Sequence, residues 1–323
     1  MKNTFIIILL FISISLFGQK DNTPAEELSP FFDISPDNKN LVISISNKEG
    51  SSLYIYSLIN HKITPLTTTK GYYTNPIYSP KGDKILFLSK DLNSENSDLY
   101  SIHLETKKIK NLTNGKIYVT EASFLPNGEK ILYCGAEVVT NYSPMARKAP
   151  HKIDLYLTEY DADKSQKLTN FRAYQLSNIQ PNKKGDTVLC KLISNNATEG
   201  FYLLSLADTV KTKVEVINNP RPEIKDNFYG TPALSHHNKQ IAFTAPYQLY
   251  IMSLKDHKCE EIWSSFGKEE QAMPIFLRFD KKDEKIFFSI LTIVNRRYNF
   301  NAKIYSFDIK TKKLTRIEIP LRD

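Results

Sequence analysis

Short apolar runs alternate with polar turns along most of the chain. In the clearest stretch these runs occupy residues 75–80, 84–88, 98–104 and 109–113. They are rich in β-branched and aromatic residues, and turn residues separate them, which is the pattern of β-strands. No helical period of apolar residues is visible, so the stretch predicts a unit of four short antiparallel strands.

Six tyrosines repeat this unit along the chain. Each follows a bulky apolar residue and precedes an aliphatic residue by twelve positions, as in Leu99, Tyr100 and Leu112. The six are Tyr54, Tyr100, Tyr156, Tyr202, Tyr250 and Tyr305. Self-similarity at a period of roughly 45–55 residues indicates a repeat architecture. We expect the tyrosines in the third strand of each unit, packed between neighbouring units.

The turn between the first two strands follows a proline in the first four units, at Pro36, Pro80, Pro126 and Pro181. Proline fixes φ, and a Gly or Asn that follows tolerates a positive φ, so the pattern is typical of a tight turn. The fifth unit has His236 in the place of proline, and the sixth turn, at residues 279–283, has also lost it.

Six units of four strands predict an all-β fold, a six-bladed β-propeller of four-stranded antiparallel blades. We expect the blades at residues 29–67, 74–113, 120–169, 176–217, 230–263 and 272–319. A solenoid is the alternative, but a solenoid needs polar caps, and here both ends carry ordinary strand patterns. A closed ring leaves no strand edge exposed at its ends.

The first eighteen residues have the pattern of a secretory signal peptide. Lys2 supplies the positive charge, residues 5–17 form the apolar run, and Gly18 is a small residue before the cleavage point. The run is short for a membrane span, although an uncleaved anchor is the alternative. Residues 19–28 form a polar arm. We therefore expect a periplasmic or secreted protein without stable membrane insertion after cleavage.

Charge and cysteine content change this picture little. The formal charge of +8 comes from lysines scattered over turns, a pattern that favours solubility and protected strand edges. A nucleic-acid partner would need a clustered basic patch, and none is apparent. Cys134 and Cys190 fall in second strands and Cys259 in a turn. An odd, dispersed set of cysteines does not predict a disulfide framework.

Residues 79–89, SPKGDKILFLS, and residues 98–113, DLYSIHLETKKIKNLT, resemble the propeller repeat of TolB-type proteins, a relative of WD-type repeats. The resemblance extends over residues 29–319 and is specific for the fold. It implies a ring that binds something in the bacterial cell envelope. TolB itself has an α/β domain before its propeller, and the arm here leaves no room for one. No Gly-x-Ser-x-Gly elbow of an α/β hydrolase occurs.

Propeller topology separates two surfaces. The loop rim contains the loops between second and third strands and those between blades; the hairpin rim contains the turns inside the two hairpins of each blade. Five of the eight arginines fall in the loop rim, accompanied by aromatics. Arginine and tyrosine are enriched at binding hot spots, and the guanidinium suits carboxylate or phosphate. The predicted binding residues are Tyr73, Arg147, Arg172, Arg221, Tyr229, Arg296 and Arg297. The alternative is that these aromatics only roof the ring.

No residue pattern predicts catalysis, a metal or a cofactor. His236 and His237 are adjacent in a tight turn, and consecutive carboxylates such as Glu260 and Glu261 face opposite sides of a strand. The favoured function is a non-catalytic binding or scaffold protein that engages an envelope protein, peptide or glycan, with acidic groups suited to the arginines. The alternative is a glycan hydrolase or lyase at the channel mouth, which a convergent set of His, Asp or Glu would favour.

Overall fold

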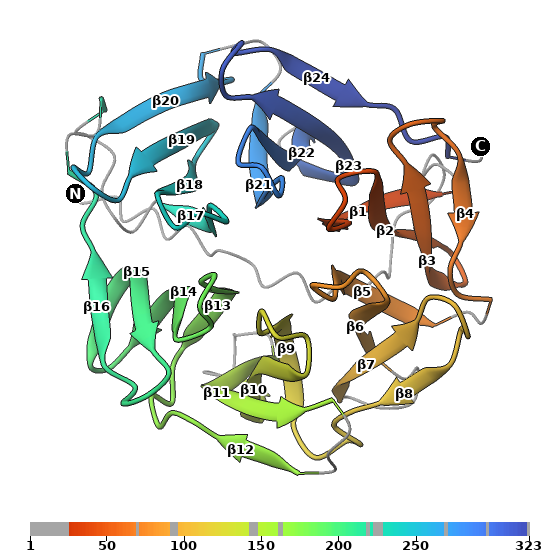
Figure 1. The fold of residues 1–323 in the computed structure, drawn as a ribbon, viewed down its shortest axis with the longest axis vertical. Coiled ribbons are helices and arrows are strands. Elements are labelled where there is room, and N and C mark those ends of the chain that lie inside the picture. Colours follow the sequence, from red (N-terminus) through yellow and green to blue (C-terminus); the bar gives the residue numbers. More distant parts are fainter. Residues whose placement is uncertain are drawn as a thin grey trace.

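The computed structural model describes residues 26–68, 71–90, 96–141, 148–160, 164–217, 220–221, 229–267, 271–294 and 297–321. These residues form 24 β-strands in six four-stranded antiparallel sheets, arranged as blades around a central axis (Figure 1). Each sheet consists of four strands consecutive in the sequence, with the first strand innermost and the fourth outermost. The predicted six-bladed propeller is confirmed.

The first three blades follow one another around the ring in sequence order. Blade one contains β1 (Glu27–Ile34), β2 (Asn40–Asn47), β3 (Gly50–Ser57) and β4 (Ile63–Pro65). Blade two contains β5 (Tyr72–Tyr78), β6 (Lys84–Lys90), β7 (Ser97–His103) and β8 (Ile109–Asn111). Blade three contains β9 (Tyr118–Phe124), β10 (Lys130–Asn141), β11 (Lys148–Glu159) and β12 (Ser165–Lys167).

The other three blades complete the ring. Blade four contains β13 (Gln175–Pro181), β14 (Thr187–Ser194), β15 (Ala197–Ser205) and β16 (Lys211–Val214). Blade five contains β17 (Gly230–Leu234), β18 (Gln240–Ala245), β19 (Gln248–Ser253) and β20 (Cys259–Ser264). Blade six contains β21 (Ala272–Phe279), β22 (Lys285–Val294), β23 (Arg297–Asp308) and β24 (Leu314–Ile317).

The polar arm overlaps the first strand. β1 begins at Glu27, two residues before the expected start of blade one, because Leu28 is buried in the junction with blade six. The predicted signal peptide lies outside the described residues. Within the described part of the chain, no helix is long and apolar enough to cross a bilayer. The three cysteines are free and buried, and Cys259 opens β20 rather than lying in a turn.

The twelve-residue spacing of the repeat is the length of the hairpin between the third and fourth strands. In blade two this hairpin brings Leu112 back beside Leu99, whose carbonyl oxygen accepts its N–H at 2.8 Å. Thr113 Oγ1 accepts the Leu99 N–H at 3.0 Å and donates to Asp98 at 2.7 Å. Blade three repeats these contacts with Asp154, Leu155 and Thr169. The motif therefore closes the outer edge of a blade.

The core lies between blades. Leu99 and Leu112 pack against blade three. On the other face, Tyr100 stacks on Phe87 with ring centroids 5.7 Å apart and lies against Leu53 of blade one. In blade two the third-strand leucine thus faces the next blade and the tyrosine the preceding one, which confirms the predicted packing between units for this blade.

The first hairpins form a ring of six turns around the channel. In each, the carbonyl oxygen of the first turn residue accepts the N–H of the fourth, which has a positive φ. The fourth residues are Asn38, Gly82, Gly128, Gly185, Asn238 and Asp283. In blade four, Asn182 is the first turn residue, because its carbonyl accepts the Gly185 N–H. Pro181 is the last residue of β13, so its expected equivalence with Pro36 is wrong, and Lys183 takes that place.

Blades one and six close the ring without exchanging a strand. Ser289 Oγ donates to the Pro30 carbonyl oxygen at 2.6 Å. The Tyr56 hydroxyl donates to the Glu318 carbonyl oxygen at 3.0 Å. Phe276 packs among the apolar residues of both blades. Closure therefore depends on packing and side-chain hydrogen bonds rather than on a shared sheet.

Candidate functional site

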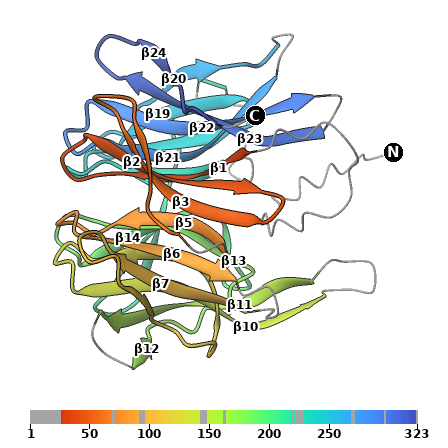
Figure 2. The same cartoon turned by 90° about the vertical axis from the view of Figure 1, so that its right-hand side faces the viewer.

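Two long hairpins extend from the loop rim. Strands β10 and β11 of blade three have 12 residues each, and β22 and β23 of blade six have 10 and 12. The second and third strands of the other blades have six to nine. Blades three and six lie opposite each other in the ring (Figure 1), and both hairpins extend to the same side (Figure 2). They therefore flank the loop rim from two directions.

Arg172 lies on the loop rim, in the crossing from blade three to blade four. The residue is exposed and has a positive φ of 46°, and its backbone N–H donates to the buried Asp154 at 3.3 Å. The neighbouring Glu137 has a lowered pKa, first because of the hydrogen bond from Lys167 and further because of the charge of Arg172. The Arg172 backbone is thus fixed while its side chain faces solvent.

Arg221 is held at the edge of blade five. Its Nε lies 2.7 Å from Glu261 Oε2, which also accepts the Tyr250 hydroxyl at 3.2 Å. The guanidinium lies 5.4 Å from the ring of Phe266, whose side chain is one of the most exposed apolar groups, at 59%. A guanidinium over an aromatic face is a favourable cation–π contact. The pair presents charge and apolar surface together.

The remaining predicted residues differ in how far the structure describes them. Tyr229 is only 3% exposed, so its ring belongs to the core between blades four and five. Tyr73 is half-buried and packs edge-on against Phe87 at 5.3 Å. Arg297 lies in β23 with its backbone opposite Val294. Arg147 and Arg296 lie outside the described residues. Of the seven, Arg172 and Arg221 are the two whose side chains the structure places at the loop rim.

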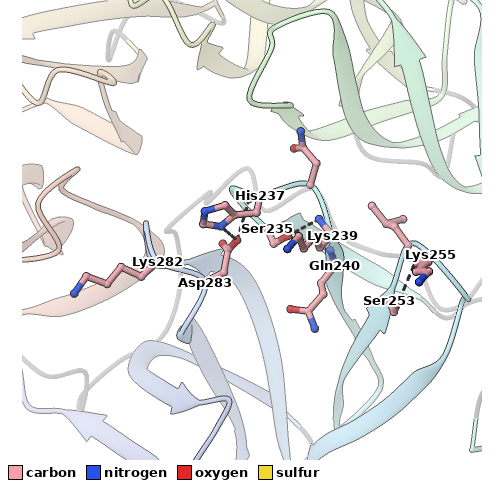
Figure 3. Close-up of a pocket in the computed structure, with 10 residues that line it drawn as sticks. Ser235, His237, Lys239, Gln240, Ser253, Lys255, Lys282 and Asp283 are labelled. Carbon is pink, nitrogen blue, oxygen red and sulfur yellow. Dashed lines mark hydrogen bonds and ion pairs between the residues drawn. The ribbon is translucent and has the colours of Figure 1, made fainter.

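A recess of about 820 Å³ lies on the opposite, hairpin rim. It is formed by the two hairpin turns of blade five and the first turn of blade six (Figure 3). The lining residues are Ser235, His237, Asn238, Lys239, Gln240, Ser253, Leu254, Lys255, Lys282 and Asp283. The sequence pattern predicted no site at the blade-five turn, where His236 stands in the place of proline. The available signal was the histidines and lysines of these turns, where the turns of blades two and three have both proline and glycine.

Asp283 organises the wall of this recess. Its carboxylate accepts the backbone N–H of His236 at 2.7 Å and that of His237 at 2.9 Å. The Nδ1 atom of His237 lies 2.6 Å from the same carboxylate. Burial lowers the pKa of His236, and the charge of Lys281 lowers it further. The turn of blade five is therefore fastened to that of blade six through one carboxylate.

Charged groups also connect the innermost strands around the channel. Arg278 Nε lies 3.4 Å from Asp33. Glu121 accepts the N–H groups of Asn178 at 2.6 Å and Ile179 at 3.0 Å, and burial raises its pKa to about 7. Among the described residues, no three His, Cys, Asp or Glu side chains come together as a metal-binding group. The described carboxylates of the channel serve contacts between blades.

The comparisons with known proteins agree with this architecture. Residues 18–142 match a family model described as the TolB beta propeller domain. TolB from Acinetobacter baumannii superposes with a TM-score of 0.61 and 12% identity, over 90% of this chain and 62% of that one. The chain thus spans less than two thirds of that TolB. No curated protein sequence matches the chain.

Oligogalacturonate lyases have a similar fold. The structure from Vibrio parahaemolyticus has a TM-score of 0.59 and 11% identity, over 91% of this chain and 79% of that one. An oligogalacturonate lyase in complex with manganese has a TM-score of 0.59 and 12% identity over the same shares. Identities this low show the fold alone. The family match over residues 18–142 and these structural likenesses together show that the six-bladed ring has a TolB-like propeller fold.

Proposed function

We propose that the protein is an exported, non-catalytic binding or scaffold protein of the cell envelope. In this proposal, the loop rim engages a protein, peptide or glycan partner. The observation that carries it is the pair of long hairpins from opposite blades, both extended from the same face. Segments held on a rigid scaffold are where binding residues gather.

The described side chains between these hairpins suit an interface. Arg172 is exposed on a fixed backbone. Arg221 and the exposed Phe266 form a cation–π pair anchored by Glu261. Arginine and aromatic side chains are the types enriched at the centres of interfaces. A partner with acidic groups fits best, because a guanidinium binds a carboxylate through two parallel hydrogen bonds.

The proposal is tested by isolating partners from envelope extract with the mature protein as bait. The recovered partner is then measured by calorimetry against two triple variants. One variant replaces the loop-rim residues Arg172, Arg221 and Arg297 with alanine. The other replaces Lys81, Lys184 and Lys310 with alanine, which removes the same charge from the hairpin rim. We expect the arginine variant to lose affinity and the lysine variant to retain it. Loss in the lysine variant alone contradicts the choice of face.

Export and the absence of catalysis have their own tests. N-terminal sequencing of the native protein should begin near Gln19, and an intact Met1 in a membrane fraction contradicts export by cleavage. The purified protein should release no unsaturated product from polygalacturonate. Such release would support the alternative, a glycan lyase.

A further inference from the structure

We propose that the recess on the hairpin rim between blades five and six is a binding site for a small anion that carries two or more negative charges on carboxylate or phosphate oxygens. We name it the basic recess and define it by Lys239, Lys255, Lys282 and His237. It lies on the opposite face from the loop rim and does not depend on the function proposed there.

Positive charge in the basic recess is uncompensated within the described residues. Lys239, Lys255 and Lys282 are exposed, and no ion pair involves any of them in the described part of the chain. The one acidic lining residue is Asp283, whose carboxylate already accepts three hydrogen bonds. With His237 neutral, the lining has a net charge of +2, so an incoming anion meets unopposed ammonium groups.

The two lysines of blade five distinguish it from every other blade. In all six blades, the residue after the positive-φ position accepts a backbone hydrogen bond from the second hairpin, at 2.8 to 2.9 Å, which fixes the equivalence of positions. The accepting residues are Lys39, Asp83, Glu129, Asp186, Lys239 and Glu284. Four of the six are acidic, so a basic residue is no requirement of the fold here.

Blade one is the closest match, and it also lacks the basic pair. Its Lys39 lies 4.0 Å from Asp37, and the position that corresponds to Lys255 is occupied by Ile59. Blade five alone therefore has lysine at both facing positions. Lys282 of blade six adds a third charge from the neighbouring turn, on the other side of the imidazole (Figure 3).

The backbone that carries these charges is fixed. Ser235 Oγ accepts the N–H groups of Lys239 and Gln240 at 3.1 and 3.0 Å, and the Lys239 carbonyl accepts the Leu254 N–H at 2.8 Å. Since a carboxylate can only accept, His237 Nδ1 must donate to Asp283. In the neutral imidazole Nε2 is then an acceptor, so the donors for an anion are the lysine ammonium groups. The site is thus preorganised in its backbone and in its imidazole.

The chemistry of the lining sets the class of ligand. Lysine ammonium groups act as compact point charges with rotatable donors, so they bind phosphate and carboxylate alike. The volume of about 820 Å³ falls in the range of small-molecule sites. Three separated ammonium groups favour a ligand with several charges over a single carboxylate.

Titration calorimetry with citrate and with inorganic pyrophosphate tests the basic recess. We expect at least one of the two probes to bind in a one-to-one complex, with an affinity that falls as salt is added. Binding of citrate alone assigns a carboxylate ligand, and binding of pyrophosphate alone assigns a phosphate ligand. Failure of both probes to bind the mature protein overturns the proposal.

A matched pair of variants locates the site. Lys239, Lys255 and Lys282→Ala should weaken binding by at least about tenfold. The control variant replaces Lys81, Lys184 and Lys310 with alanine, which removes the same charge from the same rim outside the recess. Its affinity should change less than about twofold. Both variants should unfold at temperatures close to that of the native protein. Equal losses in the two variants would show nonspecific attraction to the net charge and overturn the site.

Discussion

The ring of first hairpins is built in two different ways. In the arc from blade one to blade four, the second turn residue of blades one, two and three is a proline that faces the glycine of the next turn. The pairs are Pro36 with Gly82, Pro80 with Gly128, and Pro126 with Gly185. A Cβ atom added to these glycines would lie 3.2, 3.7 and 3.0 Å from the proline Cδ atoms. Glycine therefore permits the close approach of neighbouring turns.

In the arc from blade four back to blade one, the second residue of each turn retains an N–H. Each of these groups donates to a polar side chain at the positive-φ position of the next turn. Lys183 donates to Asn238 at 3.4 Å, His236 to Asp283 at 2.7 Å, and Lys281 to Asn38 at 3.0 Å. The contact between neighbouring turns, which we call the joint, is thus a side-chain hydrogen bond in this arc and a proline–glycine contact in the other.

The difference shows that the second residue of one turn and the positive-φ residue of the next turn match each other as a pair. Proline has no N–H, so its neighbour needs no acceptor. A residue with an N–H would leave an unpaired donor at the joint, which costs free energy. Asn and Asp accept that donor and tolerate a positive φ better than other side chains. The basic recess lies in this second arc, where the turns contain lysine and histidine.

The largest expected effects concern the blade faces, which both arcs share. Leu99→Ala and Leu249→Ala remove the same fully buried repeat leucine, one from each arc. Each should lower the free energy of unfolding by about 2–5 kcal/mol. Denaturant titration measures the change, and Lys81→Ala, in an exposed turn, should cost under about 0.5 kcal/mol. A cost near that of Lys81→Ala for either leucine would contradict the shared core.

Exchanging one joint for the other gives the next largest effect. Asp283→Gly should cost about 1–3 kcal/mol, because the N–H groups of His236 and His237 lose their acceptor. Adding His236→Pro removes one of those donors and recreates the proline–glycine pair. The double variant should therefore cost less than the sum of the single variants, by about 1 kcal/mol. Strict additivity in a double-mutant cycle would show that the two positions do not act as a pair.

The steric basis of the first arc is tested by a smaller difference. Gly185→Ala and Gly267→Ala both place a side chain at a positive φ, of 76° and 75°. A Cβ at Gly185 meets Pro126, whereas no atom lies within 4 Å of one at Gly267. Gly185→Ala should therefore be more destabilising by about 1 kcal/mol. Thermal unfolding of the two variants measures this, and equal losses would mean that backbone strain alone explains the glycine.

The fold was predictable because its determinants are local in sequence. The strand pattern, the tyrosines and the twelve-residue spacing all act within one blade, as the contacts of Leu99, Leu112 and Thr113 show. The joints were not predictable, because Asp283 contacts His236 across 47 positions and only the ring brings them together. Pro181 misled the alignment of the fourth turn because it precedes the first turn residue, Asn182, instead of following it. The basic recess was not predictable either, because three turns from two blades form its lining.

Two joints between innermost strands differ in charge, which a pH profile can detect. Glu121 joins blade three to blade four through a carboxylate, whereas Gln180 joins blade four to blade five through a neutral amide that accepts the Leu234 N–H at 2.8 Å. Burial raises the pKa of Glu121 from 4.5 to about 7. Between these values the folded protein binds more protons than the unfolded chain, so the free energy of unfolding falls as the pH rises. The lowered pKa of His236 acts in the opposite direction below pH 6.5, but native and variant proteins share it.

The test subtracts the pH profile of Glu121→Gln from that of the native protein. The difference should leave a decline in the free energy of unfolding of under about 2 kcal/mol between the two pKa values of Glu121, because solvent in the channel reduces the effect. Parallel profiles would show that Glu121 titrates alike in the folded and unfolded states, and the two joints would then be equivalent.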